Sequence, residues 1–178
     1  ATARAGHRPV LQPIRVGRLG SGKVGGGGWE GLRRNADEIQ RRAGRASEST
    51  VVADKAVNHA RSIVRGKAKV TSDAFEVVRS PGVDIVIELI GGYTIAKDLV
   101  LEAVRNGKHV VTANQALLAK HGNQIFSAAQ KHGVMVALVD AVAGGHHIIT
   151  LRRADLAANT LQGGDGQTTA TPPLTLSA

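Results

Sequence analysis

The chain has no cysteine among its 178 residues, which excludes a disulfide framework, a zinc site built on thiolates and a cysteine nucleophile. Aromatic side chains are nearly absent too, because the sequence holds one Trp, one Tyr and two Phe. No apolar run approaches the roughly 18 to 20 residues that a membrane-spanning helix needs, and no charged-then-apolar leader opens the chain. We therefore expect a soluble cytoplasmic protein with no membrane partner.

What the chain does contain is aliphatic. Hydrophobic residues make up 42% of the sequence and aromatic residues only 2%, so Val, Ile, Leu and Ala must fill the core. That mixture suits a parallel sheet buried between helices. The length suits one domain with little left over.

The charge is strongly positive, at +9, and ten basic residues against three acidic ones precede position 46. An excess of this kind favours an anionic partner. Proteins that bind single-stranded nucleic acid usually alternate basic residues with aromatic stacking platforms, which this chain nearly lacks. The arginines between 33 and 45 are better interpreted as the solvated face of a helix, so a nucleic-acid-associated protein is the least favoured hypothesis.

Short Val- and Ile-rich runs alternate with longer amphipathic stretches, which predicts successive β-α units. We expect a basic arm over residues 1–12, a Rossmann-type doubly wound parallel sheet over 13–160, and beyond it, over 161–178, a flexible tail or a severed connection to a substrate domain. The expected strands are Ile14–Leu19, Thr50–Ala53, a weak Ala68–Val70, Asp84–Ile90, His109–Thr112 and Val134–Val139.

Three helices are expected between these strands. Apolar residues at steps of three and four mark one helix over residues 29–43, a second over Thr94–Arg105 and a third over Ala116–His132. The second ends at Asn106-Gly107 and the third at Gly133, and glycine is the usual residue just beyond a helix end.

A glycine motif with the pattern G-x-G-x-x-G follows the first strand and precedes the first helix, the context in which this pattern predicts dinucleotide binding. Its glycines allow a tight turn, a close approach of backbone to pyrophosphate and close packing of helix on strand. The helix N-terminus adds free amides and partial positive charge. The six residues are Gly20, Ser21, Gly22, Lys23, Val24 and Gly25.

The second strand is followed by Asp54, the carboxylate expected to bind the adenosine ribose of the cofactor. It lies 29 residues after Gly25 rather than about 20, which a longer first helix explains. Lys55 beside it is able to meet a 2′-phosphate instead, so NAD and NADP both stay open.

Five segments extend the pattern beyond the glycine motif, and in sequence and order they resemble bacterial homoserine dehydrogenases over residues 13–159. The segments are Pro13–Gly17, Arg33–Ile39, Glu88–Thr94, Asn106–Asn114 and Ala141–Gly145. The resemblance implies NAD(P)-dependent interconversion of homoserine and aspartate semialdehyde, a step towards threonine and methionine.

The resemblance also implies a place for the nicotinamide, bordered by Ile90, Gly91 and Asn114. The family continues after this asparagine with a lysine thought to assist cofactor binding and proton handling, and here Gln115 replaces it. An amide neither titrates near neutrality nor supplies charge. Gln115 is thus the candidate catalytic position, substituted.

A monovalent cation such as Na⁺ is the second cofactor that the resemblance implies. Backbone oxygens of Val142, Gly144 and His146 are its candidate ligands, and Val139 stands where the family has a glutamate.

The family places its substrate-binding residues in a domain after the region matched here, and its full-length members are expected to be homo-oligomers. We therefore expect this chain to hold the dinucleotide and to meet its amino-acid substrate only through that further domain. The alternative is a module that binds NAD(P) without turnover, which Gln115 favours.

Overall fold

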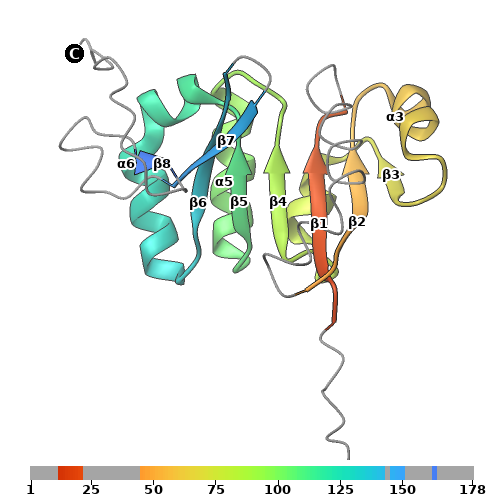
Figure 1. Cartoon of the computed structure of the whole chain (residues 1–178), viewed down its shortest axis with the longest axis horizontal. Helices are drawn as coiled ribbons and strands as arrows, with labels where there is room; N and C mark the ends of the chain where they lie inside the picture. The colour runs from red at the N-terminus through yellow and green to blue at the C-terminus, as the bar shows by residue number, and fades with distance from the viewer. Residues whose placement is uncertain (1–11, 22–44, 143–144, 151–161, 164–178) are drawn as a thin grey trace, which may run out of the picture.

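The computed structural model describes residues 12–21, 45–142, 145–150 and 162–163. Residues 22–25 of the glycine motif and the helix expected over 29–43 lie outside this part of the chain. Eight strands form one sheet in the order β3-β2-β1-β4-β5-β6-β7-β8 (Figure 1). They are β1 (Ile14–Leu19), β2 (Ser47–Ala53), β3 (Lys69–Thr71), β4 (Ile85–Glu88), β5 (His109–Thr112), β6 (Val136–Val142), β7 (Gly145–Thr150) and β8 (Gln162–Gly163).

Six strands, β1 to β6, pair in parallel, and β7 and β8 extend the sheet with antiparallel pairing. This confirms the predicted Rossmann-type sheet. The described helices are α3 (Val57–Val64), α4 (Ala74–Arg79), α5 (Thr94–Arg105) and α6 (Gln115–His132). None of these helices is both long and apolar enough to cross a membrane.

The two faces of the sheet are covered by different helices. Val51 packs in the main core with residues of α4, α5 and α6, whereas the next residue, Val52, packs against Val64 of α3. Because successive side chains of a strand point to opposite faces, α3 covers one face and α4 to α6 cover the other. In Figure 1, α3 and α6 lie at opposite ends of the sheet.

The order of the parallel strands creates a switch point beside β1. The chain moves outward from β1 to β2 and β3, then returns to the other side of β1 to form β4. In open α/β sheets, ligands bind outside the carboxyl ends of the strands at such a point. The end of β1 is therefore the place where a site should lie.

Gly17 shows how closely the face under α4 is packed. A Cβ added there would lie 2.6 Å from Cγ1 of Val77 and 2.9 Å from Cγ1 of Val83. Real Cβ atoms do not approach so closely, so β1 needs glycine at this position for α4 to pack against the sheet.

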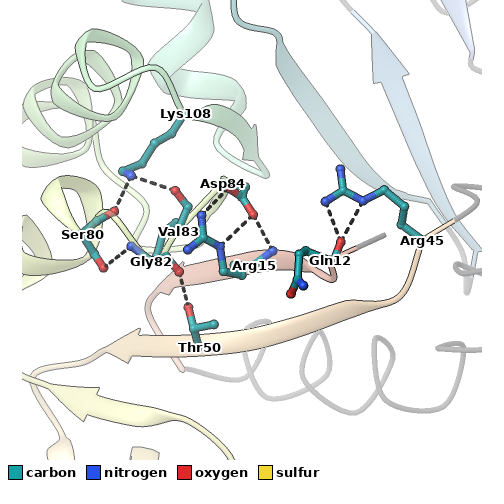
Figure 2. Close-up of polar contacts among 9 residues, drawn as sticks. All are labelled: Gln12, Arg15, Arg45, Thr50, Ser80, Gly82, Val83, Asp84 and Lys108. Atoms are coloured by element: carbon teal, nitrogen blue, oxygen red, sulfur yellow. Dashed lines mark hydrogen bonds and ion pairs between the residues drawn. The ribbon is translucent and has the colours of Figure 1, made fainter. Parts of the chain in front are cut away.

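The amino-terminal edge of the sheet is held by polar bonds between loops and strands (Figure 2). Arg15 reaches both carboxylate oxygens of Asp84, at 2.9 and 3.2 Å. Lys108, only 4% exposed, donates to the carbonyl oxygens of Ser80 and Val83 at 2.5 and 2.8 Å.

Several elements differ from the sequence prediction. Helices α3 and α4 have eight and six residues, too few for apolar periodicity to reveal them. Strand β2 begins three residues earlier than expected, β4 is shorter than Asp84–Ile90, and β6 continues to Val142. Gln162 and Gly163, assigned to the tail, pair with β7.

Candidate functional site

The carboxyl ends of β1 and β2 are joined through Gly20, Ser21 and Asp54. The Gly20 amide donates to the carbonyl of Ala53 at 2.8 Å. The amide and the hydroxyl of Ser21 both donate to Oδ2 of Asp54 at 2.5 Å. The start of the glycine motif is thus fixed against the carboxylate predicted to bind ribose.

Gly20 has a φ of +95°, in the region that side chains with a Cβ rarely adopt. An added Cβ would also lie 3.2 Å from the carbonyl oxygen of Leu89, just after β4. The Leu89 amide donates to the carbonyl of Leu19 at 2.9 Å. The turn after β1 therefore lies directly against the end of β4, at the switch point.

The pKa of Asp54 is held below its ordinary value. Partial burial acts to raise it, but hydrogen bonds from Ser21 and from the amide of Ala56, together with nearby His59, outweigh the burial. Asp54 is consequently ionised at neutral pH. Its Oδ1 accepts from the Ala56 amide at 2.7 Å.

The end of β4 carries Glu88, which is completely buried. Its Oε1 accepts from the amides of Ile90 at 2.7 Å and Gly91 at 3.2 Å. The turn that follows is exposed, with Ile90 41% accessible, and a Cβ added at Gly91 would meet nothing within 4 Å. The buried carboxyl group thus binds the backbone amides of a turn whose outer side is exposed.

The end of β5 carries Thr112, the register partner of Glu88. The Thr112 hydroxyl donates to Oε2 of Glu88 at 2.5 Å and accepts from the amide of Asn114 at 3.0 Å. Asn114 caps α6, since its Oδ1 accepts from the amide of Leu117 at 3.0 Å. Its Nδ2 donates to the carbonyl of Gly92, so the cap of α6 also contacts the turn after β4.

The structure brings most of the described candidate residues to one edge of the sheet. Gly20, Ser21 and Asp54 meet at β1 and β2, and Ile90, Gly91 and Asn114 meet at β4 and β5. Gln115 is the first residue of α6, beside Asn114, and is exposed. Lys55 is exposed next to Asp54. The roles of these residues stay predictions.

The cation prediction also stays a prediction. Val142 pairs with Gly145, and His146 pairs with Ala141 on the adjacent antiparallel strand, so two of the proposed backbone ligands lie on neighbouring strands. Gly144 lies outside the described residues.

Two residues of the site, Glu88 and Thr112, have no role in the sequence prediction. A charged residue at the end of an otherwise Val- and Ile-rich strand, with a hydroxyl residue at the end of the next, was the available signal. Only the parallel register shows that the two side chains are neighbours.

The described residues fit a dinucleotide. A left-handed glycine turn ends β1, an ionised aspartate follows β2, and an exposed apolar residue with open backbone follows β4. A tight turn before the phosphate loop, an acceptor for a ribose hydroxyl and an exposed apolar surface for a flat ring are features that a dinucleotide site requires.

Comparison with known proteins agrees with this geometry. A profile of the family described as "Homoserine dehydrogenase, NAD binding domain" matches residues 20–139. The homoserine dehydrogenase of Pseudomonas aeruginosa is 50% identical over 151 residues, which are 85% of this chain and 34% of that protein. That of Neisseria gonorrhoeae is 48% identical, over 85% of this chain and 35% of that protein.

Solved structures give the same result. A homoserine dehydrogenase from Thiobacillus denitrificans matches with a TM-score of 0.68 at 52% identity, over 71% of this chain and 29% of that one. A homoserine dehydrogenase from S. aureus matches with a TM-score of 0.65 at 27% identity, over 71% and 32%. The chain spans about a third of the length of these relatives.

Proposed function

This chain belongs to the homoserine dehydrogenase family as its NAD-binding domain, and from that premise we propose that it binds NAD(P) for an enzyme that interconverts homoserine and aspartate semialdehyde. The substrate is proposed from the names of the relatives. The binding of the dinucleotide has independent support from the geometry of the sheet edge.

The observation that carries the proposal is the convergence of three strand ends at the switch point. The Leu89 amide after β4 donates to the carbonyl of Leu19, next to Gly20, and Ser21 contacts Asp54 after β2. Residues far apart in sequence thus form one surface, which has a turn suited to phosphate at one place and an open apolar turn at another. A dinucleotide needs both on one edge.

Each part of the cofactor has proposed partners in the chain. The motif from Gly20 to Gly25 would hold the pyrophosphate, Asp54 would accept from the adenosine ribose, and the turn at Ile90 and Gly91 together with Asn114 would border the nicotinamide. When bound, the nicotinamide accepts or donates the hydride. The role of this chain is to hold and orient that ring and to exclude water from it.

The ionised Asp54 favours NAD over NADP. A carboxylate accepts a hydrogen bond from a ribose hydroxyl but repels a 2′-phosphate. Lys55 is the competing group, since its ammonium would attract that phosphate, but Asp54 is the residue fixed by hydrogen bonds at the β1 turn.

Turnover requires more than this domain. Holding reactants within about 3 to 3.5 Å supplies roughly 7 to 11 kcal/mol of a barrier, and we propose that the residues which hold homoserine belong to the two thirds of the relatives that this chain does not span. We expect the purified 178-residue chain to bind cofactor and to form no NADH or NADPH from homoserine.

A module that binds NAD(P) without turnover is the second candidate, because Gln115 provides an amide where the resemblance implies lysine. The two candidates differ when the longer protein is assayed with homoserine. Formation of reduced cofactor there supports the enzyme, and its absence with cofactor binding intact supports the module.

The direct test of the proposal is titration of the chain with NADH, followed by the intrinsic fluorescence of Trp29 and by the fluorescence of NADH itself. Gly22→Val should abolish binding and leave the fold intact, because it puts a side chain where phosphate must approach. Gly82→Ala is the matched control. An added Cβ at Gly82 lies 3.5 Å from Oγ of Ser80, an ordinary contact at the other end of the strands. Unchanged affinity in Gly22→Val would overturn the site assignment.

A further inference from the structure

We infer that Glu88 is a positioning residue for the cofactor, acting through Thr112 to hold the turn after β4 and the start of α6 in one arrangement. The inference rests on the proposed function, because it assumes that these two segments border the nicotinamide. It gives a role to two residues that have none in the sequence prediction.

Burial gives the first argument. Glu88 and Thr112 are both 0% exposed, and they lie side by side at the ends of neighbouring strands. A buried carboxyl group is costly unless its oxygens are bonded. An aliphatic residue, like those that fill the rest of the strand, would avoid that cost but would not make the bonds by which Glu88 reaches the turn after β4 and the end of β5.

The hydrogen bonds give the second argument. Oε1 of Glu88 binds the amides of Ile90 and Gly91, and Oε2 binds the hydroxyl of Thr112. All three donors lie at the carboxyl edge. The carboxyl group therefore joins the turn after β4 to the end of β5.

The chain of contacts continues on both sides of this pair. Thr112 accepts from the amide of Asn114, and Asn114 in turn binds the Gly92 carbonyl. On the other side, the carbonyl of Leu89 lies against Gly20. Every described candidate segment bordering the nicotinamide, and the first glycine of the motif, is thus within one or two contacts of Glu88.

The turn benefits from such support because the space outside its two glycines is open. Gly91 and Gly92 have φ angles of +78° and +70°, and a Cβ added at either would meet nothing within 4 Å. Glycine has the largest conformational freedom to lose. Bonds to the amides of the turn reduce that freedom before the cofactor arrives, and such preorganisation raises affinity by lowering the ordering cost of binding.

Thr112→Val provides the cleanest test, since it removes the hydroxyl with little change in shape. We expect the dissociation constant for NADH to rise about tenfold, which corresponds to about 1.4 kcal/mol. Thr112→Ser keeps the hydroxyl and should restore the affinity. Glu88→Gln should weaken binding as well. Its oxygen can still accept from the amides of Ile90 and Gly91, but its nitrogen cannot accept from the Thr112 hydroxyl.

Thr50→Val is the matched control. The Thr50 hydroxyl donates to the carbonyl of Gly82 at 3.0 Å, near the opposite end of the strands (Figure 2). Thr50→Val should lower the melting temperature by less than Thr112→Val, because Thr50 is only half-buried and its hydroxyl makes one bond. It should leave the dissociation constant for NADH unchanged. A purely structural role for Thr112 would instead give both valine variants wild-type affinity at temperatures where they are folded.

Amide hydrogen exchange provides a second measurement, independent of the cofactor. Thr112→Val should speed exchange at Asn114 and Leu117 in the unliganded chain, and Glu88→Leu, which removes both acceptor oxygens, should speed it at Ile90 and Gly91. Wild-type exchange at these amides together with wild-type NADH affinity would overturn the positioning role while leaving the proposed function standing. Absence of NADH and NADPH binding by the unaltered chain would overturn both.

Discussion

The two edges of the parallel sheet hold their polar side chains against different partners. At the amino-terminal edge, Arg15 binds Asp84 and Lys108 binds two carbonyl oxygens (Figure 2). At the carboxyl edge, Asp54 and Glu88 bind backbone amides in the loops that follow the strands. Cationic side chains are donors at one edge, whereas at the other the two carboxyl groups accept from the backbone amides of the turns after the strands.

The two edges also differ in how far their residues are exposed to solvent. At the amino-terminal edge, Lys108 is covered and its donors are used within the fold. At the carboxyl edge, Ile90 is 41% exposed above a buried Glu88. From this difference we predict that substitutions at the first edge change mainly the stability and that substitutions at the second change mainly the affinity for the cofactor.

The largest effect should come from Lys108→Met, which keeps the apolar stem and removes the ammonium. The carbonyl of Val83 then loses its donor in a buried place, at a cost of about 1 to 3 kcal/mol in the free energy of unfolding. Thermal unfolding should show a drop of about 2 to 4 °C for each kcal/mol. The affinity of the folded variant for NADH should be unchanged.

The exposed Lys131 in the last turn of α6 gives the control for that experiment. Lys131→Met should leave the affinity unchanged and lower the free energy of unfolding only by the roughly 0.3 to 1 kcal/mol that a cation contributes at a helix C-terminus. A Lys108→Met variant that is folded but binds NADH more weakly would mean that the amino-terminal edge also serves the ligand.

Asp54→Ala should have the next largest effect, and on specificity. NAD should bind about tenfold more weakly, as expected for a lost hydrogen bond to a charged group, while NADP should lose little because a repulsive charge disappears with the bond. Titrations with both reduced cofactors measure the ratio. Equal losses would assign Asp54 to holding the turn at Ser21 rather than to the choice between the two cofactors.

Asp73→Ala is the control variant for Asp54→Ala. Asp73 also accepts from an amide two residues ahead, that of Phe75 at 2.8 Å, as Asp54 does from Ala56. It caps α4, so its loss should lower stability and leave the preference between cofactors as it was.

Gln115→Lys should have two smaller effects: it should lower the stability of the chain and raise its affinity for the cofactor. A cation in the first turn of α6 opposes the helix dipole at a cost of about 0.3 to 1 kcal/mol. The same charge should tighten NADPH binding by up to about fivefold, since an exposed ion pair contributes about 0.2 to 1 kcal/mol. The exposed Gln124 later in α6 supplies the control, Gln124→Lys, which should bind NADPH as the unaltered chain does.

Homoserine-dependent formation of NADPH is measured on the same variant. We expect none from either Gln115→Lys or the unaltered chain. Robust turnover by either would show that these 178 residues already hold the substrate.

The smallest effect should be the pH dependence that Asp84 adds at the amino-terminal edge. The hydrogen bond from Arg15 is the main cause that holds the pKa of Asp84 below its ordinary value, against a smaller opposing effect of burial. A carboxyl group whose folded pKa is lowered stabilises the fold above its unfolded pKa, near 4, and loses that contribution as the pH falls through the folded value.

Asp84→Asn should therefore be less stable than the unaltered chain at pH 7 and approach it near pH 3 in urea unfolding. The difference should be small because 38% of the Asp84 side chain is exposed. The exposed Asp98→Asn on α5 is the control. A constant gap between the two proteins across this range would assign the effect to packing rather than to charge.

Much of the fold follows from local pattern. The sequence predicts β1, β5 and α5 with the bounds that the structure has, and it places α6 within one residue. These elements have strong apolar periodicity or clear ends, such as the Asn106-Gly107 stop after α5. By contrast, α3 and α4 are too short for periodicity, and their apolar residues fit a loop equally well.

The candidate site likewise contains residues that local pattern reveals and residues that it does not. Asp54 is predicted from the sequence because it directly follows the strand after the glycine motif, 29 residues beyond Gly25. Glu88 is missed because its partner Thr112 is 24 residues away, and no local pattern pairs them. The same holds for the contact of Ser21 with Asp54, across 33 residues.

Residue composition and local pattern are enough to predict the aliphatic core, the lack of thiol chemistry, the glycine turn after the first strand and the family. The strand order, which sets the switch point beside β1, and the register, which joins Glu88 to Thr112 at the carboxyl edge, emerge only when the sheet is assembled. Alternation along a strand fixes which face a side chain takes. It does not fix which strand lies alongside or at what offset, and those are set by packing over the whole sheet.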